Sequence, residues 1–125
     1  MILRKDAIGY LNRKLSLPST GMEQDWEIEL ANLNRIEEFI LFYRGSLLNE
    51  EEKKALMALI IASYDDYLNE KNSNNVRFEN DIFKLLNEDK KLFKELIVYW
   101  SVPRENNPED YFKITPFIRS VNISI

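Results

Sequence analysis

The sequence predicts an all-α fold: a single compact domain of about five or six helices around a central apolar helix at about residues 50–69. Apolar residues recur at the helical spacing i, i+3, i+4, i+7 through most of the chain. Only the segment 24–30 could also form a strand, and no second strand is available to pair with it. The 125 residues are enough for one domain and too few for two of ordinary size, so residues 1–125 are treated as one unit.

The N-terminal part predicts two helices joined by a turn. Apolar residues at helical spacing predict a helix at about 3–15, and the turn-forming residues 18–21 end it. In the segment 24–30 apolar and polar residues alternate as in a strand, but Trp26 and Leu30 also stand four residues apart. Because a strand would have no partner, we expect a short helix there.

Residues typical of helix ends define the middle of the chain. Asn34 is the expected N-cap of a helix that ends at Gly45, with that glycine in the left-handed conformation. Asn49 is expected to start the next helix, which has an acidic first turn and reaches about Asn69. This helix is apolar nearly all round, which is typical of a helix at the centre of a domain.

The C-terminal part predicts two further helices followed by short ones. Helices are expected at about 78–86 and 92–100, and they could also form one kinked helix because no glycine or proline separates them. The apolar run 97–100 is expected to lie in the core. The pairs Asn107–Pro108 and Thr115–Pro116 place a capping residue before a proline, so each is expected to begin a short helix.

The composition excludes several kinds of active site. The chain has no cysteine and no histidine, which removes thiolate chemistry and the commonest general base and transition-metal ligand. The three glycines are isolated, so no phosphate-binding loop can be formed. The longest strongly apolar run, 56–62, is too short to cross a membrane, and the N-terminus lacks the order of a signal peptide. We therefore expect a cytoplasmic protein with no cofactor, no metal site and no membrane partner.

The net charge of −4 is distributed unevenly along the chain. Residues 1–22 carry a net charge of +3, residues 23–52 carry −7, and residues 53–125 are neutral overall. An acidic surface repels nucleic acid and attracts basic proteins. The sequence therefore predicts a basic protein partner and no nucleic acid.

Five residues of the acidic stretch are candidates for the protein-binding surface. Asp25, Glu27 and Glu29 surround Trp26, and an aromatic residue among carboxylates can anchor a basic partner. Alternatively, Trp26 holds a short helix against the core while the acids face water. Glu37 belongs to the same acidic stretch and is included in the predicted surface.

Two adjacent carboxylates on the central helix, Asp65 and Asp66, complete the predicted surface. They could instead bind Mg²⁺ or act in acid–base chemistry, but adjacent helical residues diverge by about 100°, so they cannot grip one ion together. In the structural alternative, one aspartate pairs with a cation or caps a neighbouring helix while the other is solvated. Arg104, Lys113 and Arg119 are the candidate cations.

The segments 24–31, 34–39 and 52–66 resemble small bacterial proteins of the contact-dependent and polymorphic-toxin immunity type. Such immunity proteins are small, cytoplasmic and often acidic, and they bind a basic nuclease toxin domain to block it. The resemblance covers the middle of the chain and implies no particular functional residue.

These observations lead to one expected function and two alternatives. We expect a non-enzymatic protein-binding module of the immunity type that inhibits a basic toxin or nuclease domain. The first alternative is a small regulatory or adaptor subunit of a bacterial complex. The second is an enzyme that uses carboxylate–metal chemistry at Asp65 and Asp66.

Overall fold

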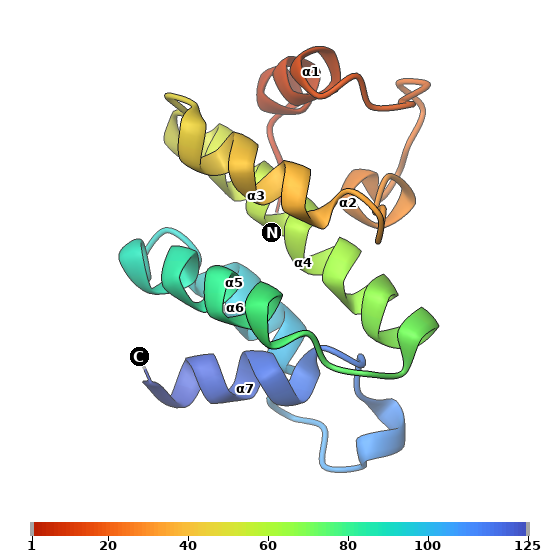
Figure 1. Ribbon diagram of the computed structural model, residues 1–125, viewed down its shortest axis with the longest axis vertical. Coiled ribbons are helices and arrows are strands. Elements are labelled where there is room, and N and C mark those ends of the chain that lie inside the picture. Colours follow the sequence, from red (N-terminus) through yellow and green to blue (C-terminus); the bar gives the residue numbers. More distant parts are fainter. Residues whose placement is uncertain (1, 125) are drawn as a thin grey trace.

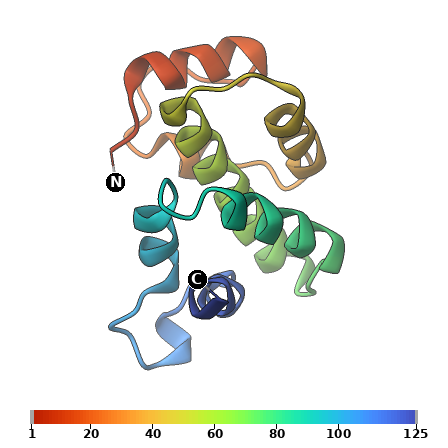
Figure 2. The same ribbon diagram turned by 90° about the vertical axis from the view of Figure 1, so that its left-hand side faces the viewer.

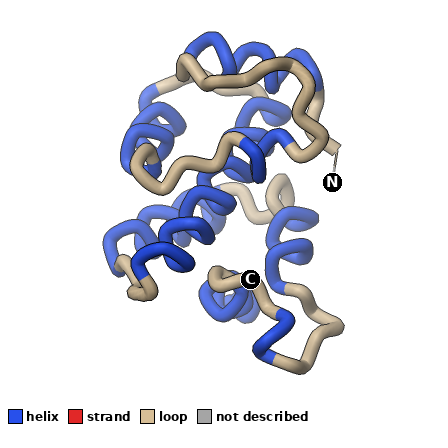
Figure 3. The backbone as a smooth tube through the Cα atoms, turned by 90° about the vertical axis from the view of Figure 1, so that its right-hand side faces the viewer, coloured by secondary structure: helices blue, strands red, loops and turns tan. Residues whose placement is uncertain are grey.

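The computed structural model describes residues 2–124, apart from the side chains of residues 123 and 124, and this range contains helices and loops but no strand (Figures 1 and 3). The all-α prediction is confirmed. A short 3-10 helix, η1 (Pro108–Asp110), lies between the last two α-helices. The α-helices of the described range are α1 (Lys5–Lys14), α2 (Trp26–Glu29), α3 (Ile36–Gly45), α4 (Glu50–Lys71), α5 (Val76–Glu88), α6 (Lys94–Ser101) and α7 (Thr115–Ser124).

Helix α4 is the centre of the fold, as the sequence predicts. Every residue from 55 to 65 is buried, because neighbours cover this helix on nearly all sides. Helices α1, α2, α3 and α5 pack directly against α4, whereas α6 and α7 pack mainly against each other. In Figure 1, α1–α3 lie on one side of α4 and α5–α7 lie on the other. The described range has seven α-helices, more than the five or six expected, and the short helices predicted at 24–30 and at Thr115–Pro116 are among them, as α2 and α7.

The predicted start of the central helix is confirmed at Asn49. Its side chain accepts a hydrogen bond of 2.8 Å from the backbone N–H of Glu52, and the Glu52 carboxylate accepts one of 3.0 Å from the backbone N–H of Asn49. This reciprocal pair satisfies two N–H groups that would otherwise lack partners at a helix start. The helix extends two residues beyond the predicted end and is closed by Asn72 in the left-handed conformation, with φ of 51°.

Two predicted features of α3 are wrong. Asn34 does not cap the helix, because the helix begins at Ile36 and the residue at the cap position is therefore Arg35. Gly45 is the last helical residue and is not left-handed, since the chain continues through Ser46 in an extended conformation. No side chain caps the start of α3.

The two C-terminal helices predicted before Pro103 are separate helices, α5 and α6, joined by a turn at residues 89–93. Asn107 caps η1 as predicted, because its side chain accepts from the Glu109 backbone N–H at 3.1 Å. The predicted cap at Thr115 is wrong. This residue is the first of α7, and its buried hydroxyl donates to the Trp100 carbonyl at 2.8 Å.

Arg119 on α7 fixes the loop that follows α6. Its guanidinium donates hydrogen bonds to three backbone carbonyls and to the hydroxyl of Tyr111. It also lies over the Tyr111 ring, 4.1 Å from the ring centre. Within the loop, Val102 has a positive φ of 44°, which is unfavourable for a β-branched residue. The backbone carbonyls that accept from Arg119 are those of Ser101, Val102 and Glu105, at 2.7, 2.7 and 2.8 Å.

Candidate protein-binding surface

Helix α6 has one buried face and one exposed face. Leu96, Ile97 and Trp100 are buried, as the sequence predicts for this apolar run. Val98 and Tyr99 are not in the core, contrary to the prediction, because their side chains are 41% and 54% exposed. The spacing that indicates this exposure is present in the sequence, since residues 94, 95, 98 and 99 share one face of a helix and the first two are charged.

A small acidic groove lies between α6 and the N-terminal side of the fold. Its volume is about 110 Å³. Its lining residues include Asp25 and Glu27 as well as Tyr99 and Trp100 of α6, and of the two aromatic residues only Tyr99 is exposed. Figure 2 shows the N-terminal segment of the chain close to α6, and Leu3 of this segment is part of the groove. The remaining lining residues are Ala58 and Leu96.

The two carboxylates of the acidic groove have no cation of their own. Asp25 is exposed and Glu27 is half-buried, and neither is in an ion pair within residues 2–124. Aromatic faces attract cations, most strongly when the cation is partly removed from water. The groove therefore offers charge and aromatic surface together to a lysine or arginine side chain that enters it.

Trp26 positions this groove instead of forming its surface. Its side chain is 4% exposed, and the indole N–H donates to the Asn12 side chain at 2.9 Å. This hydrogen bond ties α2 to α1, which agrees with the alternative in which Trp26 holds a short helix against the core. Asp25 and Glu27 flank Trp26 in the chain, so burial of the indole fixes where their backbone runs.

Several other acids of the 23–52 stretch are already engaged within the fold. The hydroxyls of Ser19 and Thr20 donate to the Glu23 carboxylate and lower its pKa. The Glu29 carboxylate accepts from the Asp25 backbone N–H at 2.8 Å. Glu37 forms an exposed ion pair with Arg77 of α5. The charge of −7 calculated from the sequence therefore overstates what this stretch can offer to a partner.

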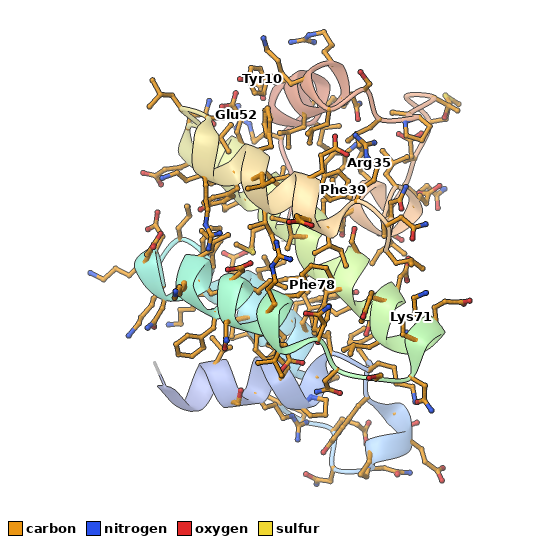
Figure 4. All side chains as sticks on the ribbon, viewed as in Figure 1. Tyr10, Arg35, Phe39, Glu52, Lys71 and Phe78 are labelled. Carbon is orange, nitrogen blue, oxygen red and sulfur yellow. The ribbon has the colours of Figure 1, made fainter. Side chains whose placement is uncertain are left out.

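Glu38 is likewise paired, with Arg35 at 2.6 Å, and this contact lowers the pKa of the Glu38 carboxyl. The same guanidinium donates to the Leu15 carbonyl and stacks on Phe39, 5.2 Å from the ring centre. Figure 4 shows Arg35 beside Phe39, at the junction of α1 and α3. Arg35 thus holds the N-terminal helices together and is not available to the groove.

The two aspartates of the central helix have different roles. Asp65 is buried, and its carboxylate accepts a 2.9 Å hydrogen bond from the backbone N–H of Ile114, next to the start of α7. Burial raises the pKa of the Asp65 carboxyl, and the hydrogen bond partly opposes this rise. Asp66 is exposed, although partial burial also raises its pKa. The structural alternative, in which one aspartate caps a neighbouring helix, therefore describes Asp65.

None of the three candidate cations forms an ion pair with either aspartate among the residues that the structure describes, although the charge of Lys113 acts to lower the pKa of the Asp65 carboxyl against the effect of burial. Arg119 is occupied by the loop after α6, and a backbone N–H takes the place that a cation was expected to fill at Asp65. Across the described residues, no group of three or more acidic side chains is arranged to hold a metal ion. No described helix combines the length and hydropathy needed to span a membrane.

Comparison with protein-family models, with curated proteins and with solved structures found no match for this chain.

Proposed function

We propose that this chain is a non-enzymatic protein-binding module that receives a basic side chain of a protein partner in the acidic groove. The observation that supports this most strongly is that Asp25, Glu27 and the exposed Tyr99 line one groove, and that neither carboxylate is in an ion pair within residues 2–124. Of the predicted binding residues, Asp25 and Glu27 form the core of the proposed surface. Trp26 supports it from the interior.

The size of the groove favours a side chain over a small-molecule ligand. Its volume of about 110 Å³ is well below the roughly 300 Å³ at which ordinary small-molecule pockets begin. A guanidinium there would contact two carboxylates and an aromatic face. A cation–aromatic contact at an exposed site contributes about 0.5–1 kcal/mol, and the carboxylates mainly raise the association rate.

We propose further that the partner is a basic toxin or nuclease domain and that binding inhibits it in the cytoplasm. Two features support this choice: the resemblance of the central segments to immunity proteins, and the concentration of negative charge in residues 23–52. The carboxylates would occupy cationic side chains that a nuclease uses to hold phosphates. Asp65 does not belong to this surface, because its carboxylate is buried and hydrogen-bonded within the fold.

The association rate tests this proposal. The partner is captured with the tagged chain, and its binding is measured by surface plasmon resonance at low salt and at about 0.5 M salt. With Asp25→Asn and Glu27→Gln combined, association at low salt should slow by about tenfold, because these charges steer the encounter. The difference should shrink at about 0.5 M salt, where charges are screened beyond about 4 Å.

The matched control neutralises two exposed acids away from the groove, Glu70→Gln and Glu109→Gln, which changes the net charge equally. This control should associate at nearly the native rate. Equal slowing in both double variants would show a general charge effect. An unchanged rate in the groove variant would place the interface elsewhere.

A further inference from the structure

The exposed face of α6 separates charges of opposite sign. Successive helical residues are about 100° apart, so Lys94 and Val98 form one stripe and Glu95 and Tyr99 form the other. All four residues border one shallow depression on the surface. Tyr99 also lines the acidic groove, whereas Lys94 and Val98 line a second groove on the opposite side of the helix.

The second groove is basic and has an apolar floor. Its volume is about 220 Å³, and Lys90, Lys91 and Lys94 surround a floor that includes Ile97 and Val98. None of the three lysines is in an ion pair among the described residues. We call these three lysines the lysine edge, and we call Asp25, Glu27 and Glu95 the acidic edge. Val98 and Tyr99 form an apolar ridge between the two edges.

We propose that this surface binds a second copy of the chain, so that the lysine edge of each copy lies against the acidic edge of the other. The order acidic edge, apolar ridge, lysine edge is self-complementary under a two-fold rotation about an axis that runs along α6. Such a rotation places ridge on ridge and exchanges the two edges. A two-fold axis across α6 would instead set like charges together.

The partner copy thereby supplies the cation that the acidic groove lacks. Among the described residues, Asp25, Glu27 and the three lysines form no ion pair, although Lys91 borders a neighbouring depression together with Asp89 and Glu95. In the dimer both edges are paired, and the exposed parts of Val98 and Tyr99 are removed from water.

The dimer deepens the proposed function and rests on the same groove. A basic partner and a second copy would compete for Asp25 and Glu27. Binding of a basic partner would therefore dissociate the dimer into monomers. The affinity of the partner would then fall as the concentration of the chain rises.

Reversing the charges of each edge tests the dimer with this chain alone. One variant combines Asp25→Lys with Glu27→Lys, and the other combines Lys91→Glu with Lys94→Glu. Sedimentation velocity is measured over a range of concentrations at low salt. The native chain should dimerise, and each variant alone should dimerise at least about tenfold more weakly, because like charges now face each other. Mixing the two variants should restore dimers that contain one copy of each.

The controls reverse equal numbers of charges elsewhere, with Glu70→Lys and Glu109→Lys in one chain and Lys71→Glu and Arg104→Glu in the other. Each control should dimerise like the native chain, and circular dichroism should show that all variants are folded. A native chain that stays monomeric at every concentration would overturn the dimer. The dimer would also be overturned if mixing the two controls strengthened association as much as mixing the two edge variants, since net charge alone would then explain the effect.

Failure of the dimer and failure of the proposed function are distinguishable. The variant with Lys91→Glu and Lys94→Glu should be monomeric and should still bind the basic partner, because its acidic groove is intact. If the native chain dimerises but the partner binds the Asp25→Lys and Glu27→Lys variant normally, the dimer stands and the proposed function fails.

Discussion

The N-terminal and C-terminal sides of α4 both bury apolar side chains, but their helices are arranged differently around α4. Helices α1–α3 pack on α4 through buried apolar side chains such as Leu11, Trp26 and Phe39. Helices α6 and α7 pack mainly on each other, and polar groups fix their ends to distant backbone. Asp65 holds the N–H of Ile114 before α7, and Arg119 holds the carbonyls after α6.

This difference shows how one chain can present two oppositely charged edges. On the N-terminal side, most acids are tied to nearby hydroxyls, backbone groups or arginines, and Asp25 and Glu27 remain unpaired by any cation in the described chain. On the C-terminal side, the buried hydroxyl of Thr115 holds the end of α6, while Lys94, Val98 and Tyr99 of this helix are exposed. Variants that remove one kind of anchor at a time should separate the two contributions.

The largest loss of stability is expected from a core substitution in α4, because helices from both sides of the fold pack on it. Leu59 is fully buried in that helix, so Leu59→Ala should lower the free energy of unfolding by about 2–5 kcal/mol, because truncation leaves a cavity. Chemical denaturation measures this loss. Leu41→Ala is the control, because Leu41 is 59% exposed, and it should cost less than about 0.5 kcal/mol. A loss below about 0.5 kcal/mol at Leu59 would contradict its central place.

A smaller and more local effect is expected on the C-terminal side. Arg119→Ala removes three hydrogen bonds to backbone carbonyls and should cost about 2–3 kcal/mol. Hydrogen exchange should become faster mainly in α6, α7 and the loop between them, while α1 changes little. Arg104→Ala is the control, because that arginine is exposed. Uniform acceleration over the whole chain would show that the two sides are not held independently.

The smallest of the three effects separates hydrogen bonding from charge at Asp65. Asp65→Ala leaves the Ile114 N–H without its acceptor and should cost about 1–3 kcal/mol. Asp65→Asn keeps an acceptor oxygen and removes a buried charge. At neutral pH this variant should therefore be at least as stable as the native chain, as chemical denaturation of the three proteins will show.

The difference in stability between the native chain and Asp65→Asn depends on pH, because the pKa of Asp65 is raised. The folded state holds this proton more tightly than the unfolded state, so native stability falls as the pH rises from the ordinary value of 3.8 through the raised folded pKa. The advantage of Asp65→Asn over the native chain should be absent at lower pH and grow across this interval. A constant difference between the two proteins would mean that the Asp65 pKa is not raised.

The features predicted most accurately from the sequence are those that depend on residues close together in the chain. The apolar spacing of the central helix and the capping pair at Asn49 involve residues within a few positions of each other, and both are confirmed. The contact of Asp65 with Ile114 spans 49 residues, and those of Arg119 span 14 to 18, so no local pattern indicated them. Asn34 is a residue type that often caps helices, but α3 begins one residue later than the pattern indicated, so Arg35 occupies the cap position.

The acidic groove was predicted only in part for the same reason. Asp25 and Glu27 followed from local charge, and the exposed position of Tyr99 was available from the pattern of α6 but was not recognised. Their meeting was not predictable, since it needs α2, α6 and the N-terminal segment to come together. The role of Trp26 was ambiguous from the sequence, because its hydrogen bond to Asn12 joins residues 14 positions apart.

Photo-crosslinking at Tyr99 is the most direct test of the claim that the acidic groove binds a basic protein. A photoreactive phenylalanine analogue replaces Tyr99 in one chain and the exposed Leu41 in a control chain, and captured proteins are identified by mass spectrometry. The account predicts that position 99 captures a basic protein that position 41 does not. Adding Asp25→Asn and Glu27→Gln should sharply reduce that yield. A second copy is also expected at position 99, but capture of no other protein there, or a yield unchanged by the neutral variant, would contradict the claim that the groove binds a basic partner.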